Sequence, residues 1–514
     1  MVHYPSIYPA NSAVFIPAIS SAYTSAYAGF LRNPGCTLPP RLTITDLNFL
    51  MSTSALYSVG IGLYSAGPSL GSEARSKRLD MVTDRVGHDA EIIADSGGFQ
   101  VAQGHIVPVS PGKKPPKGKT PWKGQFNLTN LESFAGNCDW SPVLDFPLAM
   151  LVLPEDSDQK YIDQYVERLR ANGGVDPLVL IPGTPHLTLD QLCAMNNLGP
   201  KFNTCLWYTL HNTDFLTRQP DSAMAKKLWA VYQGRCIDEA RVWSAAMRRY
   251  RLPGICFAGN FLVRGEQTIE RVVEDISLGF YDYVHRLHFL GTGELQNICS
   301  YSTLQSCLRS ETGNERLLIT ADAASPFVMF AKGSIPVGFR LGTVDWTFSS
   351  SRFADLVGMP ADRLLEDALY EIWRAKVFKG GVRAPDPVVC DRTIQVAQHF
   401  FVRSEIAKKI TVGHLGLKAD GKAASHGNLF LMNHSLQVYM EGMVVALGHY
   451  HAETPTMVPP QLLVHKRAIQ TVFDARPQDR MAVLQELGDE LNILAGLTNA
   501  PTKRVRYHDP FPPW

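Results

Sequence analysis

Polar side chains that could do chemistry stand at the ends of several short apolar runs. Four of these run ends carry Asp95, Gln233, Asn260 and Asp322. Two glycines follow soon after Asp95, and glycines let the backbone approach a flat ligand closely. Two carboxylates in one site are typical of chemistry in which one attacks a carbon atom and the other moves protons. Two structural salt-bridge aspartates are the alternative.

The apolar runs recur with helical patterns between them, a rhythm that predicts alternating strands and helices. The predicted strands are residues 91–95, 148–153, 178–181, 228–233, 255–260, 287–291 and 317–322. Between two of them, apolar residues at spacings of three and four predict a helix that begins near Asp238. In a closed (β/α)8 barrel the carboxyl ends of the strands face the active site. We therefore expect an α/β fold, a TIM barrel with insertions whose rim carries the four polar residues.

Two domains are expected in this chain of 514 residues. Residues 1–345 form the predicted barrel domain, with an insertion at about 149–203 that has a helix of its own near 161–170. After residue 345 the pattern changes, and residues 346–514 are predicted as a mainly helical C-terminal region.

The composition is that of a folded globular protein, with 45% apolar and 19% charged residues. No apolar run approaches the roughly 18 residues of a membrane span, and the first twenty residues lack a secretory signal pattern. We expect a cytoplasmic protein with no membrane partner. Its nine cysteines lie far apart without a CxxC pair, so buried reduced thiols are expected.

A net charge of +1 does not show the overall positive charge that is typical of nucleic-acid-binding proteins. Any contact with phosphates must therefore be local. The best local candidate is a proline-rich loop that carries Lys113, Lys114, Lys117, Lys119 and Lys123. A solvated surface loop is the alternative interpretation.

The segment Asp95-Ser96-Gly97-Gly98-Phe99-Gln100 resembles the signature of tRNA-guanine transglycosylases and their DNA-acting relatives. Further segments resemble this family in the same order along the chain. They are residues 228–234, which end in Gln-Gly, 259–266, in which Asn260 replaces a usual glycine, 287–293 and 320–326. A run of ordered matches is far more specific than any single motif.

The resemblance implies exchange of guanine in a nucleic acid for a deazaguanine. Asp322 would be the nucleophile that captures C1′ of the sugar, and Asp95 the general acid and base. Asp145, in a Leu-Asp-x-Pro segment, would accept hydrogen bonds from the base, with Glu155 and Asp156 as alternatives. The remaining base-binding candidates are Ser96, Gln233, Gly259, Asn260 and Leu290.

The structural zinc site of the tRNA-acting members is only half present. Residues 428–440 resemble its helix, with His434 in the histidine position, but Cys390 stands alone upstream. One thiolate and one imidazole are too few for a tetrahedral site unless His399 or His414 joins them. We expect no zinc and no other cofactor, with Cys390 and His434 as remnants. His434 is then predicted to be a packed or capping helix residue.

With the missing thiolates and the Leu-Asp-x-Pro segment, the chain resembles the DNA-modifying branch of the family, deoxypurine-in-DNA protein A, more than the tRNA-acting members. The resemblance implies DNA as the polymer, 7-cyano-7-deazaguanine or a near derivative as the incoming base, and a phage or mobile element acting in a host cytoplasm as the source. A tRNA-guanine transglycosylase, a non-catalytic partner subunit and an unrelated barrel hydrolase are the alternatives. Helper proteins and a homodimer stay open as partners.

Overall fold

The structure is a computed structural model of the chain. It describes residues 2–32, 38–66, 81–82, 88–97, 106–107, 120–121, 128–148, 190, 194, 196, 198–219, 222–234, 237–259, 265–378, 385–418 and 423–496. The strands predicted at 148–153 and 178–181 and the helix predicted near 161–170 lie outside these residues, apart from Leu148.

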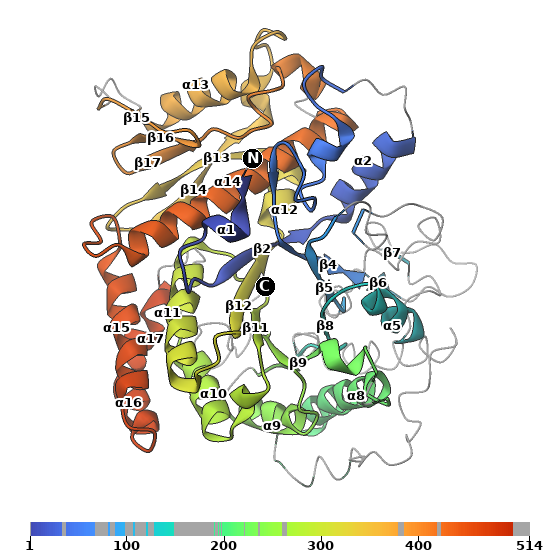
Figure 1. Cartoon of the computed structure of the whole chain (residues 1–514), viewed down its shortest axis with the longest axis vertical. Helices are drawn as coiled ribbons and strands as arrows, with labels where there is room; N and C mark the ends of the chain where they lie inside the picture. The colour runs from blue at the N-terminus through green and yellow to red at the C-terminus, as the bar shows by residue number, and fades with distance from the viewer. Residues whose placement is uncertain are drawn as a thin grey trace.

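Eight parallel strands form a nearly closed, barrel-shaped sheet at the centre of the molecule (Figure 1). In chain order they are β2 (Val14–Ile19), β4 (Ile61–Ser65), β5 (Glu91–Asp95), β8 (Ser141–Pro142), β9 (Leu228–Tyr232), β10 (Gly254–Phe257), β11 (Arg286–Phe289) and β12 (Leu318–Ala323). Each strand neighbours the next along the chain, and β12 pairs back with β2. Trp140 joins β5 to β8, because its carbonyl accepts the Ala94 N–H at 2.7 Å. The predicted α/β class and the parallel sheet are confirmed.

Helices follow the strands and lie outside the sheet (Figure 1). They are α2 (Ser21–Arg32), α5 (Leu128–Gly136), α8 (Pro200–Leu216), α9 (Ile237–Arg248), α10 (Glu266–Ser277), α11 (Leu295–Thr312) and α12 (Ser325–Ala331). The helix predicted to begin near Asp238 is α9. It buries Ala240, Trp243 and Met247, and the Trp243 indole N–H donates to the Val231 carbonyl at 2.8 Å. Spacings of three and four therefore do place one face of this helix against the sheet.

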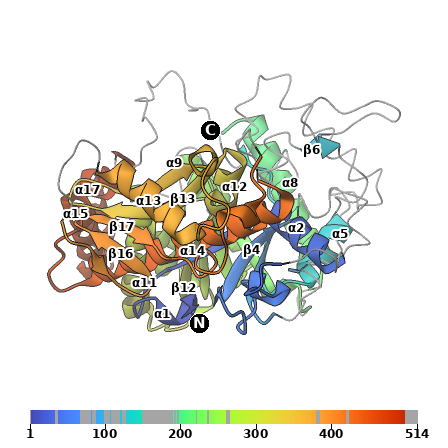
Figure 2. The ribbon, with the colours of Figure 1, turned by 90° about the horizontal axis from the view of Figure 1, so that it is seen from above.

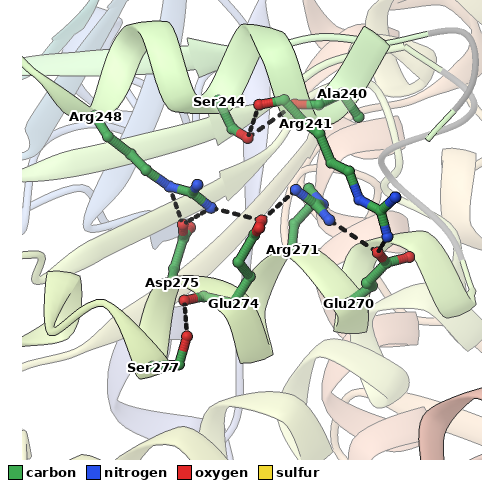
Figure 3. Close-up of polar contacts among 9 residues, drawn as sticks. All are labelled: Ala240, Arg241, Ser244, Arg248, Glu270, Arg271, Glu274, Asp275 and Ser277. Atoms are coloured by element: carbon green, nitrogen blue, oxygen red, sulfur yellow. Dashed lines mark hydrogen bonds and ion pairs between the residues drawn. The ribbon is translucent and has the colours of Figure 1, made fainter. Parts of the chain in front are cut away.

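A chain of ion pairs joins α9 to α10 (Figure 3). Its cations are Arg241, Arg248 and Arg271, and its carboxylates are Glu270, Glu274 and Asp275. Asp275 and Arg271 are buried, and Arg248 Nε donates to Asp275 Oδ1 at 2.7 Å. Removing one partner of a buried ion pair typically lowers the free energy of unfolding by about 3–5 kcal/mol. This network therefore holds together the two helices that follow β9 and β10.

An ion pair across the barrel shows which side chains face its interior. The Glu91 carboxylate on β5 lies 3.2 Å from the Arg286 guanidinium on β11. These strands lie on opposite sides of the barrel, because β4, β2 and β12 stand between them in the sheet. The Arg286 guanidinium also lies 5.5 Å from the Trp140 ring centroid. Side chains two and four residues further along a strand share its face. Asp95, four residues after Glu91, and His288, two residues after Arg286, therefore face the interior as well.

Trp229 fills the amino-terminal end of the barrel interior and needs a glycine beside it. The Trp229 indole is fully buried and stacks on Trp140 with centroids 5.7 Å apart. A methyl group added at Gly254 would overlap this indole. We therefore expect Gly254→Ala to lower the free energy of unfolding by about 1–3 kcal/mol. Gly448→Ala is the matched control, because a methyl group there meets nothing within 4 Å.

Urea unfolding of both variants measures this difference. Gly448 lies inside a helix, so its replacement by alanine should leave stability unchanged or raise it by about 0.4–1 kcal/mol. Equal stability of the two variants would show that the Trp229 packing is adaptable and that the argument is wrong.

Antiparallel strands follow the barrel and form a second sheet that the sequence analysis did not anticipate. In the order of the sheet they are β14 (Trp346–Arg352), β13 (Ser334–Leu341), β17 (His399–Val402), β16 (Thr393–Val396) and β15 (Val388–Val389). β13 and β14 pair as a hairpin, and residue 345, the predicted domain boundary, lies in its connection. Figure 2 shows α13 and this sheet on the side of the molecule away from α5.

Helices make up most of the rest of the C-terminal region within the described residues, as predicted. They are α13 (Leu365–Val377), α14 (Ser425–His451), α15 (Pro460–Asp474), α16 (Arg480–Glu486) and α17 (Gly488–Asn492). The long helix α14 lies between the barrel and the antiparallel sheet (Figures 1 and 2). Its Asn433 carbonyl accepts the Tyr57 hydroxyl at 2.8 Å. None of the helices within the described ranges has the length and apolar character that a membrane crossing requires.

Short elements complete the described structure. The N-terminal strand β1 (Val2–His3) pairs with β3 (Tyr57–Ser58), and helix α1 (Tyr4–Ile7) follows β1 directly. A further pair consists of β6 (Ile106–Val107) and β7 (Thr120–Pro121).

Candidate active site

Three aspartates meet inside the carboxyl end of the barrel. Asp95 ends β5, Asp322 lies near the end of β12, and Asp145 follows β8 by three residues. The buried Cys256 thiol on β10 has a pKa well above its usual value, because burial and the negative charges of Asp145, Asp95 and Asp322 all disfavour the thiolate. Electrostatic effects weaken with distance, so all three carboxyl groups lie near this thiol. We call these three residues the aspartate cluster.

Backbone N–H groups hold Asp322. Its Oδ1 accepts the Gly291 N–H at 2.8 Å, and its main-chain carbonyl accepts the Gly293 N–H at 2.9 Å. Gly291 has a φ of 70°, the left-handed region that glycine adopts without strain. The glycines after β11 thus let this loop fold back onto the neighbouring strand end. The Asp322 side chain is buried.

Asp95 lies in surroundings that favour its neutral acid form. Burial raises the pKa of Asp95, and the negative charge of Asp322 raises it further. The Ser65 hydroxyl, the Gly97 N–H and His288 oppose that rise without cancelling it. The Gly97 N–H donates to Asp95 Oδ1 at 3.2 Å. A carboxyl group that holds its proton more tightly than a free aspartate is suited to general acid catalysis.

Asp145 and Gln233, both predicted to bind a base, are hydrogen-bonded to each other. Gln233 Nε2 donates to Asp145 Oδ2, and Gln233 Oε1 accepts the Leu148 N–H at 2.8 Å. Burial raises the pKa of Asp145 to about 7, with a further contribution from Asp95, although the Asp145 N–H and Gln233 oppose it. Both side chains are buried. At neutral pH this carboxyl group therefore exchanges readily between its charged and neutral forms.

Helix α8 fixes the backbone around Asp145. The Thr209 hydroxyl accepts the Phe146 N–H at 2.9 Å, and Asn212 Nδ2 donates to the Leu144 carbonyl at 2.9 Å. Thr209 and Asn212 are buried in the same layer. The irregular segment after β8 is therefore held by the side chains of a regular element, which gives Asp145 a defined position.

Other predicted site residues lie at neighbouring strand ends. Ser96 is buried directly after Asp95, and Gly259 follows β10 with a φ of 81°. Leu290 is partly buried after β11, and its N–H donates to the Phe257 carbonyl at 3.1 Å. The structure thus brings Ser96, Gly259 and Leu290 to the same end of the barrel as the aspartate cluster.

Several predicted site residues lie outside the described part of the chain. They are Asn260, the alternative acceptors Glu155 and Asp156, and the lysines Lys113, Lys114, Lys117, Lys119 and Lys123. These predictions stay untested.

Two interior residues were not predicted from the sequence. His288 on β11 and Cys256 on β10 are paired in the register of the sheet and are fully buried. Strand alternation could have found them, because Cys256 stands an even number of residues before the predicted strand end at Asn260, and His288 two residues before Leu290. Because these runs are apolar on both faces, the sequence does not show which of the two alternating sets of side chains faces the interior.

His434 is a packed residue, as predicted. It is fully buried in α14, its Nδ1 lies 2.5 Å from the Ser404 hydroxyl, and its Nε2 lies 2.9 Å from the Pro336 carbonyl. Burial lowers the pKa of His434 to about 4. Cys390 is exposed in the connection between β15 and β16. In the described ranges, no group of three or more His, Cys, Asp or Glu side chains could hold a metal ion.

Comparison with known proteins gives no further indication of the chemistry. No protein-family model matches the chain, and no curated protein matches it.

Proposed function

We propose that this chain is a DNA-guanine transglycosylase, a pentosyltransferase that exchanges guanine in DNA for a 7-deazaguanine. The observation that carries the proposal is the aspartate cluster, three carboxyl groups in three different environments at one end of a barrel interior. On this proposal the sheet is a (β/α)8 barrel, whose active sites lie at the carboxyl ends of the strands.

The exchange needs one carboxylate that attacks and one acid that supplies a proton. Asp322 attacks C1′ of the deoxyribose, a C1′–O bond forms, the C1′–N9 bond breaks, and its electron pair stays on guanine. Asp95 donates a proton to the departing base and then accepts one from the incoming base. The new base attacks C1′ and releases Asp322. The raised pKa of Asp95 supports its role as the acid.

Base recognition falls to Asp145 and Gln233. A guanine edge offers two donors, N1–H and the exocyclic amino group, and a carboxylate can accept from both. Gln233 already donates to Asp145 through Nε2, and on this proposal the same amide N–H₂ also donates to the O6 acceptor of the bound base. Ser96, Gly259, Asn260 and Leu290 are assigned to the remaining edges and faces of the base.

DNA is favoured over tRNA by two features of this chain. The Leu144-Asp145-Phe146-Pro147 segment resembles the DNA-acting branch, and Asp145 lies within the aspartate cluster. His434, which would be a zinc ligand in the tRNA-acting members, has both ring nitrogens engaged with Ser404 and Pro336. A tRNA-guanine transglycosylase is the second candidate, and a non-catalytic partner subunit the third.

Incorporation of labelled 7-cyano-7-deazaguanine into duplex DNA and into unmodified tRNA, measured side by side, tests this proposal. We expect label in DNA and none in tRNA. Label in tRNA alone would replace DNA by tRNA as the polymer. Label in neither polymer, with fully folded protein and with single-stranded DNA also tried, would contradict the transglycosylase assignment and favour a non-catalytic subunit.

A further inference from the structure

A fully buried histidine faces the nucleophile with a ring nitrogen that makes no hydrogen bond in the described structure. His288 Nε2 lies 3.3 Å from Asp322 Oδ1, outside hydrogen-bond geometry, and has no hydrogen-bond partner among the described residues. The other ring nitrogen, Nδ1, lies 2.8 Å from the Thr320 hydroxyl. Leaving a buried polar atom without a partner is costly, so such an atom next to a reactive group calls for an explanation.

The neighbours of the imidazole decide where its proton lies. Nε2 faces Asp322, and His288 also acts electrostatically on Asp95. Nδ1 faces only the Thr320 hydroxyl, which can donate to it at 2.8 Å or to the Leu287 carbonyl at 3.3 Å. A lone pair on Nε2 would face the Asp322 carboxylate oxygen at 3.3 Å, so the ring proton belongs on Nε2, and the Thr320 hydroxyl then donates to Nδ1. Thr320 thus orients the ring as the second partner of a hydrogen-bonded histidine usually does.

The geometry assigns His288 as the positioning residue of the nucleophile: Nε2 lies 3.3 Å from Asp322 Oδ1 and donates to it, beside the Gly291 N–H, once a small adjustment of the ring aligns the two groups. This inference rests on the proposed function. Both contacts of the Asp322 carboxyl group in the described structure fall on Oδ1. Oδ2 is therefore the atom that attacks C1′, while Oδ1 becomes the carbonyl oxygen of the glycosyl ester.

The assignment predicts which half of the exchange depends on His288. In the first half, Oδ2 bonds to C1′ and the negative charge on the carboxyl group disappears. In the second half, the incoming base bonds to C1′, the Oδ2–C1′ bond breaks, and the electron pair returns to the carboxylate. A donor on Oδ1 stabilises that returning charge, so its removal makes Asp322 a poorer leaving group. The covalent intermediate should then accumulate while turnover slows.

Two substitutions of His288 separate its two nitrogens. In His288→Gln the side-chain amide nitrogen takes the place of Nε2 and can still donate to Asp322. In His288→Asn the amide takes the place of Nδ1, which keeps the contact with Thr320 and loses the one with Asp322. Thr320→Val removes the group that orients the ring without touching the ring itself, and Thr320→Ser is its matched control.

The test compares these full-length variants in labelled 7-cyano-7-deazaguanine exchange, in the fraction of protein bound covalently to DNA, and in thermal unfolding. For His288→Asn and Thr320→Val we expect kcat to fall about 10- to 100-fold, as for loss of a hydrogen bond to a charged group, with a raised covalent fraction and an unchanged KM for the base. His288→Gln and Thr320→Ser should stay within about threefold of the wild type.

The possible outcomes distinguish a wrong role for His288 from a wrong proposed function. Exchange by the wild type together with wild-type kcat in His288→Asn and Thr320→Val would overturn the inference alone. So would equal losses in His288→Gln and His288→Asn, or a covalent fraction that falls with kcat, because both would indicate a merely structural role. Exchange by none of the proteins, with either DNA or tRNA, would overturn the proposed function and the inference with it.

Discussion

Asp322→Asn should lose base exchange by about ten-thousandfold or more, the size of effect seen when a nucleophile is removed from an enzyme whose catalytic groups act as a unit. An amide is a far weaker nucleophile than a carboxylate, and it cannot leave again as an anion. The fold should be unaffected, because the amide oxygen can accept the Gly291 N–H in place of Oδ1, which accepts it now at 2.8 Å.

The control for this variant is Asp345→Asn. Asp345 is a partly exposed aspartate in the connection between β13 and β14, where it pairs with Arg340, and it is not part of the aspartate cluster. Its exchange rate should match that of the wild type. Labelled-base incorporation at saturating DNA measures both variants, and thermal unfolding shows whether each is folded. Exchange by folded Asp322→Asn above about one per cent of the wild-type rate would remove Asp322 from the mechanism.

Asp145→Asn should raise stability and lower activity at the same time. Because burial raises the pKa of Asp145 to about 7, the folded protein binds a proton there that the unfolded chain has already lost. Between the unfolded pKa of about 4 and the folded pKa of about 7, stability therefore falls as the pH rises. Above pH 7 the buried charge of Asp145 lowers the free energy of unfolding by its full amount, up to about 4 kcal/mol.

The neutral amide removes that penalty. We expect Asp145→Asn to be more stable than the wild type by about 2–4 kcal/mol at pH 8 and by little at pH 4, in urea unfolding at both pH values. Asp355 is the opposite case, because hydrogen bonds from Lys376 and the Arg352 N–H outweigh its burial and lower its pKa. Asp355→Asn should therefore be no more stable than the wild type at pH 8. A gain for Asp145→Asn that is the same at both pH values would contradict the account.

The activity of Asp145→Asn should fall through binding of the base. An amide cannot accept two hydrogen bonds from the guanine edge as a carboxylate does, and its own N–H₂ faces the donors of the base. We expect KM for the base to rise about 100-fold, with a smaller change in kcat. In the wild type, base binding should weaken as the pH falls below about 7, because the acceptor then gains a proton.

The sequence predicted the strands that read as uninterrupted apolar runs and missed those that do not. β5, β9, β10, β11 and β12 were all expected near their observed positions. β2 contains Pro17 and β4 contains Gly62, residues that normally argue against a strand interior, and β8 has only two residues. A methyl group at Gly62 would lie 2.9 Å from Ile19 Cδ1, the end of a side chain that can shift, so this contact does not by itself require glycine.

The antiparallel sheet was missed for a related reason. β13 carries Pro336 and Gly338 at the point where its register with β14 shifts, and a side chain on Gly338 would overlap the Phe400 backbone. β15 has only two residues and β16 only four. Local patterns in such short and interrupted strands are too weak to compete with the helical segments around them.

The candidate site was predictable where a motif marked a strand end, and not where long-range packing decided. Asp95 and Asp322 were expected at one end of a barrel, and the negative charge of Asp322 does raise the pKa of Asp95. The hydrogen bond between Asp145 and Gln233 joins residues 88 positions apart and depends on the turn after β8. His288 needed the pairing of β11 with β12, which brings it beside Thr320 and Asp322.

The covalent intermediate tests the central claim most directly. The protein is incubated with duplex DNA in the presence of the incoming base, denatured, and digested, and the peptide that carries a deoxyribose is identified by mass spectrometry. The account predicts a sugar ester on Asp322 in the wild type and none in Asp322→Asn. An ester on another residue, an adduct that persists in Asp322→Asn, or exchange without any adduct would contradict it.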